Sequence, residues 1–210
     1  MTSNLKAPRY IISGLPIAGR RQRIGLLGGS FNPAHEGHLQ ISCIAQSRLQ
    51  LDEIWWLVSP RNPLKSQRGL SNLDQRIAHA KNLPLPGFIH VTSLESAIGA
   101  RFSIETVQFL QKRFAETNFV WLIGADNLVI LHRWHAWRKL VSQIPFAVID
   151  RPGAGLKAAA SPAAQYLSRF RLDESDASAL ATANSPAWTI IHGPLSSQSS
   201  TAIRTGLWSI

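Results

Sequence analysis

The sequence predicts an α/β fold built on a doubly wound parallel sheet in a single domain. Two observations predict it: short, continuous apolar runs alternate with segments of helical spacing, and a chain of 210 residues can close one core. Uninterrupted apolar strands are typical of a parallel sheet that helices cover on both faces. With 45% hydrophobic and 16% charged residues, the composition is that of a globular protein and argues against disorder over most of the chain.

The strands are predicted from apolar runs that end at glycine, proline or polar residues. These runs cover 24–29, 54–58, 88–92, 119–123, 145–150 and 188–191. Between them, apolar residues at helical spacing predict helices over 38–49, 72–82, 103–115, 134–141 and 199–207. A parallel sheet interleaved with helices in this way is Rossmann-like.

Two parts of the chain fall outside this pattern. Residues 1–22 are a basic amino-terminal extension, which we expect to be flexible, and residues 23–210 form the domain. Residues 152–186 are rich in Ala, Ser, Pro and Gly, and we interpret them as an insertion or loop with one helix near 163–170.

The net charge is +10, from 22 Lys and Arg against 12 Asp and Glu, and suits anionic ligands. The basic extension could touch nucleic acid or an anionic membrane, although a solvated tail is the simpler interpretation. Pro8, Gly14 and Pro16 interrupt any signal-peptide region, and no run reaches the about 18 apolar residues of a spanning helix. The single cysteine, Cys43, excludes an internal disulfide framework, so we expect a cytoplasmic protein.

Ligands of such sheets bind beyond the carboxyl ends of the strands, which directs attention to residues 28–38. Gly28 and Gly29 let the backbone approach a ligand closely, and the helix that follows offers N–H groups to a phosphate. His35 and His38 could both face the same anion. The alternatives are a tight turn with surface histidines, or a zinc site, which lacks an evident third ligand. The spacing is neither a dinucleotide fingerprint nor a Walker loop.

Residues 28–38, GGSFNPAHEGH, resemble the G-G-[ST]-F-[DN]-P-x-H-x-G-H signature of nucleotidylyltransferases, and most closely that of the bacterial nicotinate-nucleotide adenylyltransferases. Residues 199–204, SSTAIR, resemble the terminal I-S-S-T-x-I-R motif of that family, with Gln198 in place of the first Ile. The bare H-x-G-H core also occurs in other nucleotidyl-transferring enzymes, so the specificity lies in the longer string.

The resemblance implies which residues bind ATP and which are catalytic. The implied ATP-binding residues are Gly28, Gly29, Ser30, Phe31, His35, His38, Ser199, Ser200, Thr201 and Arg204. His38, His35 and Arg204 are the implied catalytic residues. We expect His38 at the α- or β-phosphate with His35 beside it, and Arg204 at the end where pyrophosphate leaves.

Shorter segments resemble the acceptor-binding parts of the same family. Residues 59–65 match its V-P-x-x-x-P-P-H-K loop, with Leu64 in place of His, and residues 101–106 match [RS]-Y-[ST]-x-x-T, with Phe102 in place of Tyr. Residues 124–128 match G-x-D-x-L, with a Trp downstream. The implied mononucleotide-binding residues are Asn32, Lys65, Ser103, Thr106, Gly124, Asp126 and Trp134.

The resemblance implies transfer of AMP from ATP to nicotinate mononucleotide, giving deamido-NAD and pyrophosphate. Mg²⁺ is expected to arrive with ATP, held mostly by its phosphates. Nicotinamide mononucleotide or phosphopantetheine are the alternative acceptors on the same fold. A basic RNA-binding module is a remote alternative; Trp55, Trp56, Trp121 and Trp188 fall in apolar strand patterns and argue against it. Neither a membrane nor a nucleic acid is expected as a partner.

Overall fold

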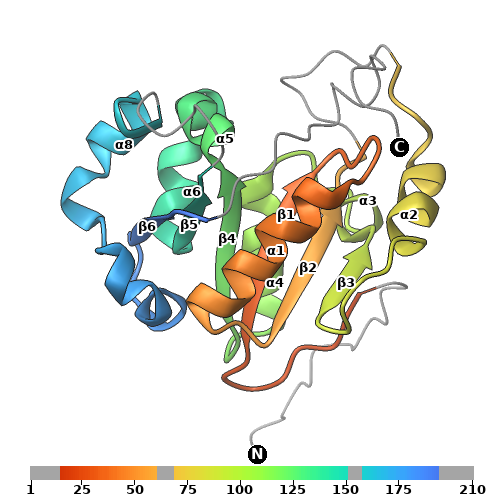
Figure 1. Ribbon diagram of the computed structural model, residues 1–210, viewed down its shortest axis with the longest axis horizontal. Coiled ribbons are helices and arrows are strands. Elements are labelled where there is room, and N and C mark those ends of the chain that lie inside the picture. Colours follow the sequence, from red (N-terminus) through yellow and green to blue (C-terminus); the bar gives the residue numbers. More distant parts are fainter. Residues whose placement is uncertain (1–14, 61–68, 151–157, 194–210) are drawn as a thin grey trace, which may run out of the picture.

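The computed structural model describes residues 15–60, 69–150 and 158–193. Within these ranges six strands form one parallel sheet in the order β3-β2-β1-β4-β5-β6, as Figure 1 shows. The strands are β1 (Arg23–Gly29), β2 (Glu53–Val58), β3 (Ile89–Thr92), β4 (Asn118–Gly124), β5 (Phe146–Ile149) and β6 (Trp188–Ile191). All six predicted strands are present, and the doubly wound parallel sheet is confirmed.

The strand order places the crossover of the fold between β1 and β4. From β1 the chain moves outward to β2 and β3, then returns to the other side of β1 and continues through β4, β5 and β6. Leu26 of β1 therefore lies between Trp55 of β2 and Trp121 of β4. The carboxyl ends of β1 and β4 are neighbours at this crossover, which is where ligands of open α/β sheets bind.

Helices cover both faces of the sheet and form two apolar cores. Alternate residues of each strand face opposite sides, so Ile24 and Leu26 pack into one core and Leu27 into the other. One face is covered by α1 (Glu36–Leu49), α2 (Leu73–Lys81) and the 3₁₀ helix η3 (Glu174–Thr182). The opposite face is covered by α3 (Leu94–Ala97), α4 (Ser103–Arg113), α5 (Ala125–Ile130), α6 (Trp137–Gln143) and α8 (Pro162–Tyr166).

Several helix boundaries differ from the predictions. α1 begins at Glu36, two residues earlier than expected, because His35 caps it. α6 begins at Trp137, and the predicted start at 134 lies just after the 3₁₀ helix η1 (Leu131–Arg133). α3 and α5 were not predicted, since helices of four and six residues are too short to show an apolar periodicity. The predicted helix over 199–207 lies outside the described residues.

Residues 158–186 belong to the segment interpreted as an insertion or loop with one helix near 163–170; they contain that helix and further short ones. This stretch folds into α8, the 3₁₀ helix η2 (Ser168–Phe170) and η3. Ala163 and Leu167 pack into one core, and Ala177 and Leu180 pack into the other. Small alanine side chains let these short helices lie close to the sheet. In this stretch a high alanine content therefore accompanies burial and not a surface loop.

The described part of the basic extension, residues 15–22, lies beside the turn that precedes β4. The Arg21 N–H donates to the Glu116 carbonyl at 2.6 Å, and the Asn118 N–H donates to the Gln22 carbonyl at 2.8 Å. Leu15 and Ala18 are partly buried against the core. These contacts are at the amino ends of the strands, on the opposite edge of the sheet from residues 28–38.

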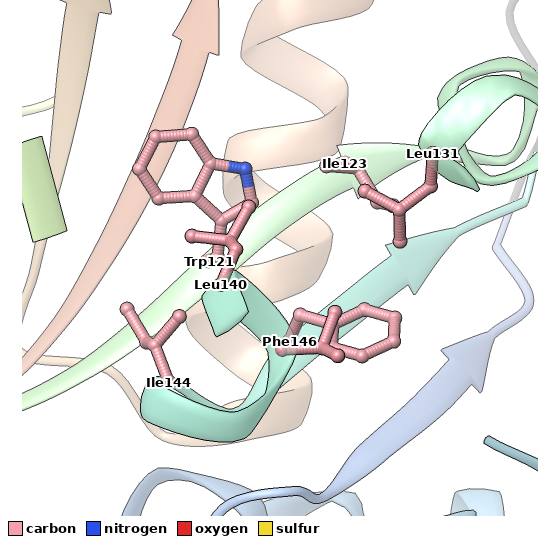
Figure 2. A pocket seen from close by; sticks show the side chains of 7 residues that line it. Trp121, Ile123, Leu131, Leu140, Ile144 and Phe146 are labelled. Carbon is pink, nitrogen blue, oxygen red and sulfur yellow. The ribbon is translucent and has the colours of Figure 1, made fainter. Parts of the chain in front are cut away.

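A small apolar cavity lies between β4, β5 and α6 (Figure 2). Its volume is about 10 Å³, and Trp121, Ile123, Leu131, Leu140, Val141, Ile144 and Phe146 line it. A water molecule needs about 10–15 Å³ and several polar partners. This cavity is therefore a gap in the core packing and not a ligand site. No helix among the described residues is long and apolar enough to cross a membrane.

Candidate active site

Two imidazole rings lie side by side where α1 begins. In Figure 1, α1 begins near the upper end of β1. His35 is the N-cap of α1, and its Nδ1 accepts a hydrogen bond from the Gly37 N–H at 3.1 Å. His38 is the third residue of the helix, and its Nδ1 accepts from the His35 N–H at 3.2 Å. The ring centroids are 4.0 Å apart. Because each Nδ1 is an acceptor, each neutral ring carries its proton on Nε2, as a hydrogen-bond donor.

A stack of aromatic rings supports this pair from inside the protein. The Phe31 ring packs against both His38, with centroids 4.6 Å apart, and Trp56, with centroids 5.0 Å apart, and the His38 and Trp56 centroids are 5.9 Å apart. Phe31 is buried and has a φ of 46°, a left-handed backbone conformation that few non-glycine residues adopt. The strand-to-helix loop thus turns sharply at Phe31, and the turn inserts its ring beneath His38.

Ser42 and Trp56 add hydrogen bonds beneath the same histidine. The indole Nε1 of Trp56 donates to the Ser42 Oγ at 2.8 Å, and the Ser42 hydroxyl donates to the His38 carbonyl at 2.8 Å. Both side chains are 0% exposed. Sequence reasoning placed Trp56 in the core and did not single out Ser42; a serine on the apolar face of a helix was the available signal.

The two glycines at the end of β1 make room for aromatic side chains. A Cβ at Gly28 would lie 3.1 Å from the Trp121 ring, and a Cβ at Gly29 would lie 3.3 Å from the Phe31 ring. We expected these glycines to clear space for a ligand. A Cβ at either position would press against one of these rings, so the glycines fit the packing beneath the site, and their close approach to a ligand stays a prediction.

Asn32 connects the loop after β1 to the segment before α2. Its Nδ2 donates to the Gly69 carbonyl at 2.9 Å, and the Ser71 N–H donates to its Oδ1 at 3.2 Å. The peptide bond between Asn32 and Pro33 is cis. Asn32 was expected to bind the mononucleotide, whereas its buried side-chain amide bonds to the protein backbone.

Arg76 of α2 joins the ends of two strands. Its guanidinium donates to four backbone carbonyls: Ser30 at 2.6 Å, Ser59 at 2.8 Å, Ser71 at 2.9 Å and Pro60 at 3.3 Å. The side chain is 3% exposed, and burial lowers the pKa of this guanidinium. Arg76 therefore holds the loops after β1 and β2 against α2.

A buried carboxyl, Glu95, links the end of β2 to α4. The Ser59 hydroxyl donates to Glu95 Oε2, and the Thr106 hydroxyl donates to Glu95 Oε1 at 3.3 Å. The two hydrogen bonds lower the pKa of Glu95, but burial raises it by more, so its pKa lies above the ordinary value. Thr106 was expected to contact the mononucleotide. Its side chain is 0% exposed and bonds to Glu95, and its contact with a mononucleotide stays a prediction.

The remaining acceptor-side residues lie around the crossover between β1 and β4. Gly124 is the last residue of β4, Asp126 is an exposed residue of α5, and Ser103 is the first residue of α4. Trp134 is half-buried against the core. Beside it, the His135 ring stacks on Phe102 with centroids 4.1 Å apart. Five expected site residues lie outside the described ranges: Lys65, Ser199, Ser200, Thr201 and Arg204.

A larger cavity, of about 300 Å³, lies between the loop after β1 and α2. Phe31, Asn32, Pro33, Ser71, Gln75, Arg76 and His79 line it. The sequence did not single out Gln75 or His79. The His79 ring contacts the Ala34 carbonyl through Nε2 at 3.1 Å, so this part of α2 is attached to the loop that carries His35.

Two of the alternatives can be compared with the structure. Among the residues described, no three His, Cys, Asp or Glu side chains gather as metal ligands, so His35 and His38 have no third partner there for zinc. Trp55, Trp56, Trp121 and Trp188 are at most 3% exposed, which confirms their assignment to the core. They do not form a surface on which nucleic-acid bases could stack.

Comparisons with known proteins agree on one family. The family model described as cytidylyltransferase-like matches residues 26–206. A probable nicotinate-nucleotide adenylyltransferase of Bradyrhizobium sp. (strain ORS 278) is 47% identical over 188 residues, covering 89% of this chain and 98% of that protein. The protein of the same name from Methylorubrum extorquens (strain PA1) is 50% identical over 183 residues, covering 87% and 99% of the two chains.

A solved structure supports the fold. The Plasmodium falciparum nicotinic acid mononucleotide adenylyltransferase complexed with NaAD superimposes with a TM-score of 0.64 at 20% identity. The match covers 88% of this chain and 83% of the other. At this identity the likeness concerns the fold.

Proposed function

Since the chain belongs to the cytidylyltransferase-like family, and within it to the nicotinate-nucleotide adenylyltransferases, we propose that it transfers the adenylyl group of ATP to nicotinate mononucleotide in NAD biosynthesis. The products are deamido-NAD and pyrophosphate. We expect the enzyme to act in the cytoplasm.

The observation that carries the proposal is the pair of imidazoles at the start of α1. The Nδ1 atom of each ring accepts a hydrogen bond from a backbone N–H, so Nε2 of each ring carries the proton and can donate a hydrogen bond to a ligand. A helix amino terminus carries a partial positive charge and favours a phosphate. The pair lies beyond β1, at the crossover of the sheet, where this fold binds nucleotides.

The reaction needs positioning and charge stabilisation more than an activated side chain. An oxygen of the acceptor 5′-phosphate attacks the α-phosphorus of ATP, the new P–O bond forms, and the bond to the β-phosphate oxygen breaks to release pyrophosphate. The attacking group is already an anion, so no serine or cysteine nucleophile is required. Donors at the α-phosphate and at the leaving pyrophosphate stabilise the charge that develops.

We assign the donors as follows. His38 binds the α- or β-phosphate and the bridging oxygen, with His35 beside it, and the amides of Gly29 to Phe31 line the same end of β1. Ser199, Ser200, Thr201 and Arg204 hold the β- and γ-phosphates, because hydroxyls and a guanidinium bind phosphate oxygens well. Lys65, Ser103, Gly124, Asp126 and Trp134 hold the mononucleotide.

Mg²⁺ is proposed as the companion of ATP. Mg²⁺ is commonly bound by one or two carboxylates together with substrate phosphates, so it needs no cage of protein ligands. The described residues offer no such cage and are compatible with an ion that is carried mainly by ATP. When bound, the ion would neutralise phosphate charge.

The acceptor is tested by measuring pyrophosphate release from ATP and Mg²⁺ with the purified chain. Nicotinate mononucleotide, nicotinamide mononucleotide and phosphopantetheine are supplied separately at equal concentrations. The proposal expects the highest kcat/KM with nicotinate mononucleotide. A higher value with either of the other two acceptors would replace it, and the absence of pyrophosphate with all three would reject adenylyl transfer.

A further inference from the structure

Ser42 and Trp56 make contacts that bear on the orientation of His38. The Ser42 hydroxyl donates to the carbonyl of His38, one helical turn earlier, and accepts from the Trp56 indole. Because both side chains are buried, their polar atoms must find partners inside the protein. These two hydrogen bonds connect β2, which carries Trp56, to the turn of α1 that carries His38.

The rings add a second constraint on the same residue. The Phe31 ring packs against His38 and is stacked on Trp56 with an interplanar angle of 22°. The Trp56 ring also lies directly beside the His38 ring, with centroids 5.9 Å apart. Trp56 thus acts on His38 in three ways: ring to ring, through Phe31, and through Ser42 to the backbone. A rotation of the His38 ring would require the stack to move, and Trp56 is held by the sheet on which it lies.

From these contacts we infer that Trp56 and Ser42 are positioning residues for the adenylyl transfer, which hold the His38 ring so that its Nε2–H is aimed at the phosphates of ATP. The inference rests on the proposed function of His38. Neither residue touches substrate, because both are enclosed in the core. They act through the position of His38 and not through contacts of their own with ATP, so their loss should slow the chemical step more than it weakens ATP binding.

The chain offers a matched control in Trp188 of β6. Trp188 is also buried, its Nε1 donates to the Leu167 carbonyl at 2.8 Å, and its ring stacks on Phe146 with centroids 5.5 Å apart. It makes the same kinds of contact as Trp56, but its partners are Phe146 of β5 and Leu167, whereas those of Trp56 are Phe31 and Ser42 beside His38. Trp188→Phe removes an equivalent indole hydrogen bond without reaching His38.

The experiment compares Trp56→Phe with Trp188→Phe, and Ser42→Ala with Thr189→Val. Thr189 is a buried residue whose hydroxyl donates to the Leu172 carbonyl at 3.2 Å, so it controls for the loss of a buried hydroxyl. The Ser42 variant is the smaller change and keeps the test valid if Trp56→Phe folds poorly. Two quantities are measured: kcat and KM for ATP, and the tautomer of the His38 ring by ¹⁵N NMR of the nucleotide-free protein.

We expect Trp56→Phe and Ser42→Ala to lower kcat about ten-fold or more, with a KM for ATP within about three-fold of the parent. Their His38 ring should shift from the Nε2–H tautomer towards a mixture. The control variants should keep the tautomer of the parent and a kcat within about two-fold of it.

Three results would overturn the inference: a kcat and tautomer unchanged in the two test variants, a shifted tautomer without loss of kcat, or an equal loss of kcat in the controls. A parent protein that releases no pyrophosphate with any acceptor rejects the proposed function instead. In that case the tautomer comparison still decides whether Trp56 and Ser42 orient His38.

Discussion

Replacing Arg76 with methionine tests whether this residue holds the loops of the site together. Methionine has a similar length and no donors, so the substitution leaves four backbone carbonyls, those of Ser30, Ser59, Pro60 and Ser71, without their guanidinium. Three of the four hydrogen bonds measure 2.6–2.9 Å, and the fourth, to Pro60, is longer at 3.3 Å.

The expected change in the free energy of unfolding of Arg76→Met follows from two opposing effects. Each hydrogen bond from a charged donor contributes about 1.5–3 kcal/mol, but removing a buried guanidinium also relieves the cost of its desolvation. Each buried carbonyl left without a donor costs about 1–3 kcal/mol, so after the relief of desolvation the net cost of losing four donors is about 3–5 kcal/mol. We expect a loss of that size in the free energy of unfolding, which is a large part of the about 5–15 kcal/mol of a typical domain.

Urea unfolding followed by tryptophan fluorescence measures the loss, since the chain has seven tryptophans. Arg48→Met serves as the control, because Arg48 forms a partly exposed ion pair with Glu174 at 2.9 Å. Such pairs contribute at most about 1 kcal/mol. If Arg76→Met lowered the free energy of unfolding no more than Arg48→Met, Arg76 would not hold the loops after β1 and β2 against α2.

Four further outcomes are expected. His38→Ala should lower kcat about 10²-fold or more with an unchanged far-UV CD spectrum, and near-normal turnover would contradict the role of His38. Folded Glu95 keeps its proton above its ordinary pKa of 4.5, so unfolding free energy should fall as pH rises through that raised pKa, and Glu95→Gln should flatten this dependence. Glu174 behaves oppositely: burial raises its pKa, but hydrogen bonds from His192 lower it overall. Its stabilisation should disappear as pH falls through that lowered pKa, and Glu174→Gln should abolish this acid loss in urea titrations. Deleting residues 1–22 should reduce the melting temperature but leave kcat/KM within about two-fold, because the contacts of 15–22 lie at the far edge of the sheet; an inactive, folded truncation would contradict this.

The regular part of the fold could be read from the sequence because its signals are local. β1, β2 and β4 are uninterrupted apolar runs, and their burial is what makes them continuous. α5 and the stretch from 158 to 186 could not be read in this way. A six-residue helix shows less than two turns of periodicity, and alanine is common both in loops and at close helix packing.

The candidate site was partly predictable for a similar reason. His35 and His38 are three residues apart at a strand-to-helix junction, which is enough to bring their rings together. The burial of Thr106 against Glu95, and the contact of Ser42 with Trp56, join segments that are distant along the chain. No local pattern records such contacts, so the sequence indicated neither the bond of Thr106 to Glu95 nor the role of Ser42.

The hydrogen bond from Arg76 to the Ser30 carbonyl also determines the direction of an amide. The peptide bond between Ser30 and Phe31 is trans and planar, so the Phe31 N–H points away from the carbonyl that Arg76 binds. The buried Arg76 guanidinium therefore fixes the direction of the Phe31 N–H on the opposite side of the loop after β1. Through one rigid peptide plane, Arg76 fixes the direction of this donor at the end of β1, where we propose that phosphate binds.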